Sequence, residues 1–116
     1  MSISEKKWVL ELTDGFRVAA VVGAAAELGV FEAIPEQGIT ADELASRLAC
    51  SIRGIQVLCD ALAGLSLLEK RDGTYFLPPK LRPVLRESGA ETVIPMLQHR
   101  MNMMRGWANL PWTVKA

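Results

Sequence analysis

The stretch from Gly38 to Pro79 constrains the fold most strongly, because it contains the signals for two helices and a tight turn in a fixed order. Thr40 predicts the N-cap of a helix, and Glu43 three residues later completes the pattern of a capping box. Behind this start, apolar residues recur at the spacing that places them on one face of a helix. The residues of this stripe are Ala41, Leu44, Ala45, Leu48 and Ala49. We therefore expect a first helix with a single apolar face.

A second helix and a small two-stranded β-hairpin are predicted after it. Ser51 is a second N-cap candidate. The apolar stripe behind it consists of Ile55, Leu58, Cys59, Leu62 and Leu65. Asp72-Gly73 predicts a tight turn between strands at residues 67–70 and 74–77, and Pro78 ends the second strand. Helix, turn, helix and hairpin together indicate a winged-helix unit at residues 38–79, within a mainly α-helical fold.

Apolar helices are expected on both sides of this unit. Residues 3–13, which include Ile3, predict a short amphipathic helix that is too small to be stable alone. Residues 16–34 are rich in alanine, glycine and valine, so that their apolar surface covers more than one side of a helix. Residues 91–107 predict the last substantial helix. Its two apolar rows are Val93, Leu97, Met101 and Met104, and Met96, Met103, Trp107 and Leu110.

A helix with two apolar sides must be covered on two sides, and the alanine-rich helix allows two interpretations. It is either the central helix of a small bundle, or it contacts the winged-helix unit on one side and a second protomer on the other. We favour the second interpretation, in which the helices of two copies interlock in a homodimer. The predicted dimer interface consists of Trp8, Phe16, Val18, Ala19, Val22, Gly23 and Ala26.

The charge balance argues against nucleic acid as a partner, although a winged helix suggests DNA binding. The chain has 13 basic and 13 acidic residues and therefore no net charge. The outer face of the second helix consists of Arg53, Gln56 and Asp60. The carboxylate of Asp60 would lie opposite the phosphates of DNA, which is unfavourable. A local basic cluster consists of Lys70, Arg71, Lys80, Arg82 and Arg86, and we interpret it as a solvated rim. A winged-helix DNA-binding transcriptional regulator remains the alternative function.

No pattern of a catalytic, cofactor or metal site is present in the 116 residues. Gly-x-Ser-x-Gly, Gly-x-Gly-x-x-Gly and a glycine-rich phosphate loop are all missing, and His99 is the only histidine. We interpret Cys50 and Cys59 as reduced packing residues of a cytoplasmic protein. The N-terminus lacks the apolar run of a signal peptide, and charged residues interrupt the longest apolar stretch, so no membrane contact is expected.

Several runs resemble the N-terminal dimerisation domain of class I S-adenosylmethionine-dependent O-methyltransferases that act on small molecules. They lie at residues 14–34, 39–45, 53–62 and 67–69, and they cover nearly the whole chain in the order of that family. The resemblance implies a domain that interlocks with its twin and covers the substrate pocket of a following catalytic domain. It also implies that the winged helix serves packing and does not read DNA.

The resemblance further suggests residues for the wall of a substrate pocket. The family pattern Met-x-x-Trp-x-x-Leu matches Met104, Trp107 and Leu110. By this resemblance Met104 contacts a small aromatic or polyketide-like substrate and Trp107 supports the same wall, with Met103 and His99 added because they lie nearby on the helix. Two departures from the family are Ser66, where glycine is usual, and Pro111, where the helix tends to continue.

The resemblance implies S-adenosylmethionine as the cofactor of the catalytic domain. That Rossmann-like domain is missing from these residues, so we expect no cofactor in this chain and no methyl transfer by the chain alone. The predicted function is therefore dimerisation and lining of the substrate pocket. A free-standing adaptor that pairs with the exposed helices of a methyltransferase is a third interpretation.

Overall fold

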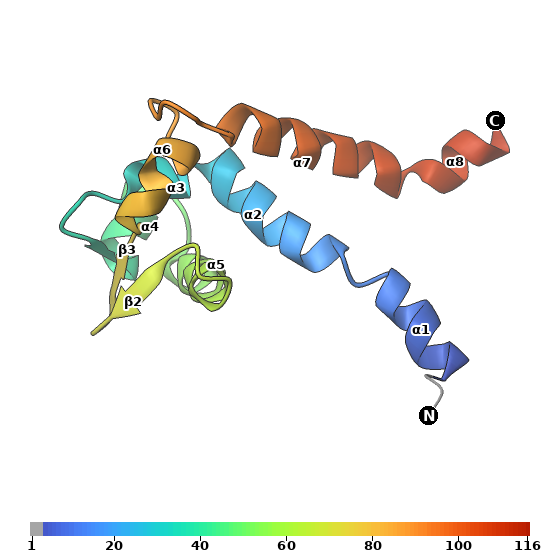
Figure 1. The fold of residues 1–116 in the computed structure, drawn as a ribbon, viewed down its shortest axis with the longest axis horizontal. Helices are drawn as coiled ribbons and strands as arrows, with labels where there is room; N and C mark the ends of the chain where they lie inside the picture. Colours follow the sequence, from blue (N-terminus) through green and yellow to red (C-terminus); the bar gives the residue numbers. More distant parts are fainter. Residues whose placement is uncertain (1–3) are drawn as a thin grey trace.

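The computed structural model describes residues 4–116 and shows two helical arms that extend from a core lobe (Figure 1). The N-terminal arm (residues 5–28) contains α1 (Glu5–Leu12) and α2 (Phe16–Leu28). The C-terminal arm (residues 93–115) contains α7 (Ile94–Ala108) and α8 (Leu110–Lys115). Ile3 of the predicted first helix lies outside the described residues.

The core lobe (residues 30–92) joins the two arms. Its elements in chain order are α3 (Val30–Ala33), β1 (Ile39–Thr40), α4 (Ala41–Leu48), α5 (Ile52–Gly64), β2 (Glu69–Arg71), β3 (Thr74–Phe76), a 3₁₀ helix (Pro79–Leu81) and α6 (Arg82–Leu85). The alanine-rich stretch of residues 16–34 is divided at Gly29, whose φ of 79° ends α2 and turns the chain into α3.

Both predicted helix starts in the core lobe are confirmed. The Thr40 hydroxyl accepts a hydrogen bond from the Glu43 amide at 3.3 Å, and the Ser51 hydroxyl accepts one from the Gly54 amide at 2.9 Å. Within residues 4–116, the Glu43 side chain makes no return bond to Thr40, so only half of the capping box is formed. The prediction that Ala49 belongs to the apolar stripe of α4 is wrong. It is exposed, because it ends the helix with a left-handed φ of 55°.

The hairpin turn at Asp72-Gly73 is also confirmed, with φ angles of 51° and 77°. The hairpin is part of a larger sheet than the sequence predicted. Strand β1 pairs with β3 and makes a three-stranded antiparallel sheet in the order β1-β3-β2. Ile39 lies opposite Tyr75, and Thr40 lies opposite Thr74. A strand of two residues is too short to show the alternation that predicts strands, so no sequence pattern indicates β1.

The hydrophobic core lies between the helices and the sheet of the core lobe. Its largest fully buried side chains are Phe31, Ile34, Ile39, Leu44, Ile55, Leu62, Leu68, Tyr75 and Leu77. The end of α2 belongs to this core through Ala25 and Ala26, and the start of α7 belongs to it through Ile94. The roots of both arms are therefore anchored in the core, whereas the outer parts of the arms extend beyond it.

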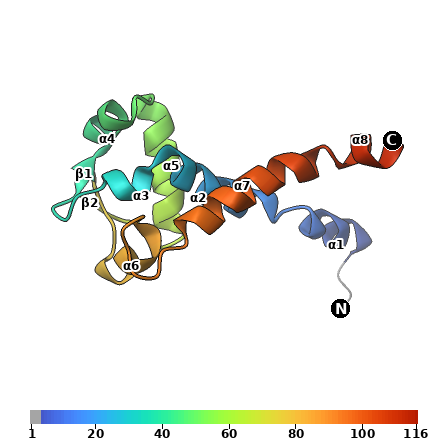
Figure 2. The same cartoon turned by 90° about the horizontal axis from the view of Figure 1, so that it is seen from above.

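The arms contact each other where α2 packs against α7 and then diverge toward α1 and α8 (Figure 2). Pro95 and Pro111 lie in the first turns of α7 and α8, where a missing amide proton does no harm. Pro111 thus coincides with the start of a separate short helix.

The radius of gyration is 16.8 Å, whereas a compact domain of this length has about 13 Å. None of the helices in residues 4–116 has the length and apolar character needed to span a bilayer.

Candidate functional site

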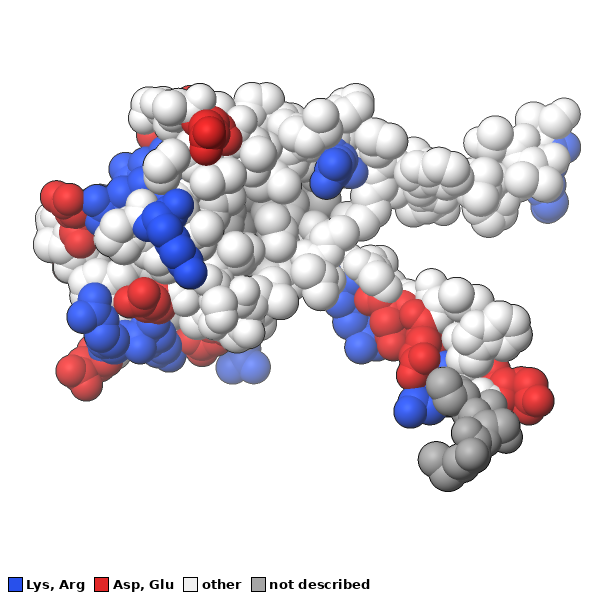
Figure 3. All heavy atoms as spheres, viewed as in Figure 1, with Lys and Arg blue, Asp and Glu red and all other residues white. Residues whose placement is uncertain are grey.

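The two arms carry most of the exposed apolar side chains of the molecule. On the N-terminal arm these are Trp8, Val9, Leu10, Leu12, Phe16, Val18 and Leu28. On the C-terminal arm they are Val93, Met96, Met103, Trp107, Leu110, Trp112 and Val114. Trp8 is 57% exposed and Trp107 is 64% exposed. Figure 3 shows that uncharged side chains cover almost all of the C-terminal arm in this view. Such a large exposed apolar surface is typical of an interaction site.

The structure divides the predicted interface residues into an exposed and a buried set. Trp8, Phe16, Val18 and Ala19 are exposed, and Val22 is half-buried. Gly23 and Ala26 are instead buried within the single chain. The Met101 side chain lies over Gly23, since the absence of a Cβ lets α7 approach closely. These two small residues therefore serve packing inside one chain and offer little surface to a partner.

A groove between α2 and α7 brings together residues from both predicted sets. Its volume is about 210 Å³, and it is lined by Val18, Ala19, Val22, Gly23, Leu97, Arg100, Met101 and Met104. Met104, predicted for the pocket wall, thus shares a groove with Val18 and Val22, which were predicted for the dimer interface. The lining is apolar apart from Arg100, so the groove suits an apolar side chain or ring.

The other predicted wall residues lie elsewhere on α7. Met103 and Trp107 border a shallow depression next to Gly106, away from the groove that Met104 lines. His99 is exposed, and within residues 4–116 its side chain makes no hydrogen bond. Within α7 the two apolar rows therefore face two directions, as the spacing in the sequence predicted. Leu110 of the second row lies outside α7, because that helix ends at Ala108 and Leu110 begins α8.

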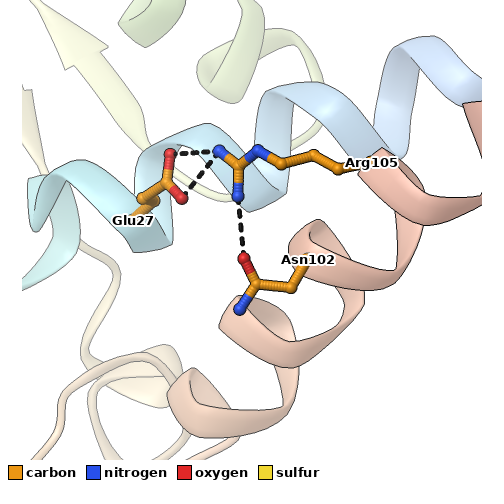
Figure 4. A network of polar contacts seen from close by, with 3 residues as sticks. All are labelled: Glu27, Asn102 and Arg105. Atoms are coloured by element: carbon orange, nitrogen blue, oxygen red, sulfur yellow. Dashed lines mark hydrogen bonds and ion pairs between the residues drawn. The ribbon is translucent and has the colours of Figure 1, made fainter.

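A network of polar contacts fixes α7 against α2 beside the groove (Figure 4). Arg105 donates from Nη2 to both carboxylate oxygens of Glu27, at 2.8 and 2.9 Å. Its Nη1 donates to Asn102 Oδ1 at 2.8 Å, which holds the guanidinium in place from its own helix. Sequence reasoning missed this contact, since 78 positions separate the two charges. The network joins the two arms at the helix segment that carries Met104.

Several members of the predicted basic cluster are already bound within the chain. Lys70 donates to Asp60 Oδ1 at 2.9 Å, and the Tyr75 hydroxyl donates to the same oxygen at 2.6 Å. The hydrogen bonds from Tyr75 and then Lys70 lower the pKa of the Asp60 carboxyl. Arg82 donates to Glu36 at 2.8 Å, and Arg86 donates to the carbonyl oxygen of Ile34. These contacts use cations that phosphate binding would require to be free.

The part of the chain that the structure describes offers no set of ligands for a metal ion. Among residues 4–116, no group of three His, Cys, Asp or Glu side chains lies close enough together to hold one. Cys50 and Cys59 are free thiols. Burial, with a smaller contribution from the Asp60 charge, raises the pKa of the Cys59 thiol to about 11. A thiol with this pKa stays protonated at neutral pH and is a poor nucleophile.

A protein-family model described as the O-methyltransferase dimerisation domain matches residues 10–79, which is more than half of the chain. The chain belongs to this family. The O-methyltransferase resemblance stated from the sequence is thereby confirmed. The region matched includes α2 and the whole sheet, so the arm that contacts α7 is part of the family's defining segment.

Similarities to individual proteins support the same family assignment. The chain is 37% identical over 73 residues to acetylserotonin O-methyltransferase of Gallus gallus, covering 59% of this chain and 21% of that protein. It is 30% identical over 110 residues to the N,N-dimethyltransferase OxyT of Streptomyces rimosus, covering 93% of this chain and 32% of that protein. A solved structure described as PigF with SAH has a TM-score of 0.82 at 26% identity, covering 98% of this chain and 34% of that chain. The chain thus spans about a third or less of the length of these relatives.

Proposed function

We propose that this chain is the dimerisation domain of an S-adenosylmethionine-dependent O-methyltransferase, which pairs two copies through its arms and lines the pocket of a small methyl acceptor. The observation that supports this most strongly is the apolar surface that both arms expose beyond the core lobe. Apolar side chains in such numbers favour association, because a partner removes their surface from water.

The exposed area supports the same conclusion. The chain has 8077 Å² of accessible surface, whereas a compact monomer of its mass is expected to expose about 6,200 Å². The excess of about 1,900 Å² per copy exceeds the roughly 800 Å² that each partner buries in a standard interface, and it lies in the range of obligate homodimers. A second copy can cover this excess if it contacts both arms.

The cofactor belongs to the part of the relatives that this chain does not cover. The solved PigF structure contains SAH, but the groove between α2 and α7 has no carboxylate or amide side chain to bind ribose hydroxyls or an amino-acid group. The lining of this groove therefore does not fit S-adenosylmethionine, and we assign its binding to the catalytic region of the whole protein.

The contribution to the acceptor pocket is assigned mainly to Met104 and Trp107. Met104 is half-buried in the groove with Val22, and its flexible thioether adapts to flat apolar ligands. Trp107 offers an exposed aromatic face, and Met103 and His99 extend the same helix surface. A small aromatic acceptor fits this lining, and the similar protein from Gallus gallus is named an acetylserotonin O-methyltransferase. The two free thiols favour a reducing compartment, so we place the protein in the cytoplasm.

The self-association is tested by sedimentation velocity of the 116-residue chain over concentrations from about 1 to about 100 µM. A dimer is expected, and a clean monomer at tens of micromolar would contradict the proposal. Val18→Asp, at a site 53% exposed on α2, is expected to shift the chain to monomer. Val57→Asp is the matched control, because its site is 62% exposed on α5 outside the arms. Equal effects of both variants would remove the arms as the interface.

The pocket wall is tested in a methyltransferase that carries this domain. Met104→Ala is expected to raise KM for the methyl acceptor and to leave KM for S-adenosylmethionine unchanged. Equal changes in both constants would indicate a general loss of structure.

Specific binding of duplex DNA with a steep salt dependence would instead favour a transcriptional regulator. Co-purification with an unrelated methyltransferase would favour the adaptor.

A further inference from the structure

We infer that helix α1 of one copy lies along the outer row of α7 in the other copy, with Glu5 beside Arg100. We define the outer row as Met96, Arg100, Met103 and Trp107. Since Met103 and Trp107 also belong to the proposed pocket wall, the α1 helix of the second copy borders that wall. The inference rests on the proposed dimer and specifies which helix faces pair in it. In a two-fold symmetric dimer this pairing occurs twice.

Helix α1 has an apolar face that the described residues 4–116 leave uncovered. The eight residues of α1 include no buried side chain, and an isolated helix of this length is not stable in water. Trp8, Val9 and Leu12 share one face with Glu5, because these positions recur at helical spacing. The ion pair between Lys7 and Glu11, at 3.8 Å, lies on the other side of the helix. The face that needs a partner thus carries one acidic residue.

The outer row of α7 has the complementary character. Its members recur at intervals of three and four residues and therefore form one line on the helix surface. Met96 is 50% exposed and Met103 is 46% exposed, while the parallel row of Leu97, Met101 and Met104 faces the groove with α2. Arg100 lies at the border of the two rows, because it also lines the edge of the groove. Within residues 4–116, Arg100 has no ion-pair or hydrogen-bond partner. An apolar row with one free cation thus matches an apolar face with one acid.

Charge also favours this pairing over a pairing of α7 with α7. The C-terminal arm carries Arg100, Arg105 and Lys115 and no acidic residue. The segment of residues 4–15 carries three acidic and two basic residues. Pairing α7 with α7 would bring like charges together, whereas pairing α1 with α7 brings opposite charges together. The lengths agree as well, since α1 is about 12 Å long and the outer row extends over about 16 Å.

The shape of one copy leaves this row open. The arms diverge beyond the contact between α2 and α7, so that α1 and α8 point apart (Figures 1 and 2). Figure 3 shows open space between the outer parts of the two arms. Helix α1 therefore does not cover the outer row of its own α7, and the α1 helix of a second copy has room to do so.

The test is a charge-reversal cycle on the 116-residue chain, with dimer dissociation measured by sedimentation at low salt. Glu5→Lys and Arg100→Glu are each expected to raise the dissociation constant about tenfold, because each disturbs two symmetry-related contacts of about threefold each. The double variant E5K/R100E is expected to recover most of the affinity. Glu11→Lys is the matched control, since it makes the same charge change on the opposite side of α1.

The outcomes separate this inference from the proposed dimer. A wild-type chain that stays monomeric would overturn both. A wild-type dimer in which the two single variants change nothing, or in which the double variant is no tighter than the single ones, would overturn the α1–α7 pairing and leave the dimer intact. Circular dichroism of each variant checks that α1 keeps its helix, and loss of helix without recovery in the double variant counts against the pairing.

Discussion

The sulfur of Met101 occupies the space in which a side chain on Gly23 would begin, because only 2.8 Å separates Met101 Sδ from the position of a Cβ on Gly23. This contact lies where the two arms meet. Next to it the groove with Met104 opens, and the Glu27–Arg105 ion pair joins the same two helices. The missing Cβ of one residue therefore sets how closely α7 approaches α2.

Replacing Gly23 with valine is expected to lower the free energy of unfolding by about 1–3 kcal/mol, because the added carbons overlap Met101 in a packed contact. Urea unfolding followed by circular dichroism measures this change. Gly64→Val is the control, since no atom lies within 4 Å of a Cβ at that helical position, and its effect is expected to stay within about 0.5 kcal/mol. A G23V variant as stable as G64V would show that the contact does not hold the arms together.

Ser66→Gly is expected to stabilise the chain by about 1 kcal/mol, because the residue has a left-handed backbone that favours glycine. Its φ is 62°, and the amide of the next residue, Leu67, donates to the Leu62 carbonyl at 3.0 Å to close the end of α5. Ser66 therefore adopts the left-handed backbone conformation that glycine usually provides at the end of a helix. A melting temperature above that of the wild type is the expected result.

Ser88→Gly is the matched control for this prediction. Ser88 is an exposed loop residue outside the set with positive φ, so glycine relieves no strain there. The control is expected to leave stability unchanged or slightly lower, since glycine increases the freedom of the unfolded chain. A similar melting temperature for S66G and S88G would argue against strain at Ser66.

The parts of the fold that the sequence predicted correctly are those that depend on neighbouring residues. Thr40 and Ser51 act as N-caps through bonds to amides three positions away, and Asp72-Gly73 forms its turn from its own backbone angles. The two apolar rows of α7 also follow from spacing alone. In each case the chemistry is complete within a few residues, so no knowledge of the remaining chain is needed.

The parts that the sequence could not predict depend on distant residues. Strand β1 exists because β3 pairs with it, and two residues alone carry no strand signal. Gly23 was predicted to contact a partner copy, but its place is decided by Met101, 78 positions away. The Glu27–Arg105 pair has the same separation. The sequence pattern of an apolar helix face predicts that another surface packs against it, but it does not predict which surface.

Asp60→Asn is expected to destabilise the chain near neutral pH and to matter little in acid. The fold lowers the pKa of Asp60 below its usual value of 3.8, first through the Tyr75 hydroxyl and then through Lys70. The carboxylate therefore adds stability that is fully present above pH 3.8 and is lost as the pH falls through the lowered pKa. Urea unfolding at about pH 7 and about pH 2.5 measures the difference between wild type and variant.

Glu69→Gln is the control for the pH dependence, because it removes a neighbouring negative charge that has no ion-pair partner within residues 4–116. Its difference from the wild type is expected to be small at both pH values. Tyr75→Phe removes one hydrogen bond to Asp60 and keeps the buried ring, so it is expected to cost about 1 kcal/mol near neutral pH. A constant difference for D60N at all pH values would contradict the role of its charge.

The Glu27–Arg105 pair is expected to couple the two arms by about 0.5–1 kcal/mol, at the upper end for an exposed ion pair, because Asn102 already orients the guanidinium. A double-mutant cycle with Glu27→Ala and Arg105→Ala, read by urea unfolding, measures this coupling energy. High salt should reduce it, since both side chains are about half exposed and their charges are screened. The Lys7–Glu11 pair serves as the comparison, because its 3.8 Å contact lies within one helix and joins no two elements. A coupling energy no larger than that of Lys7–Glu11 would mean that apolar contacts, among them that of Gly23 with Met101, fix α7 on α2 without help from the ion pair.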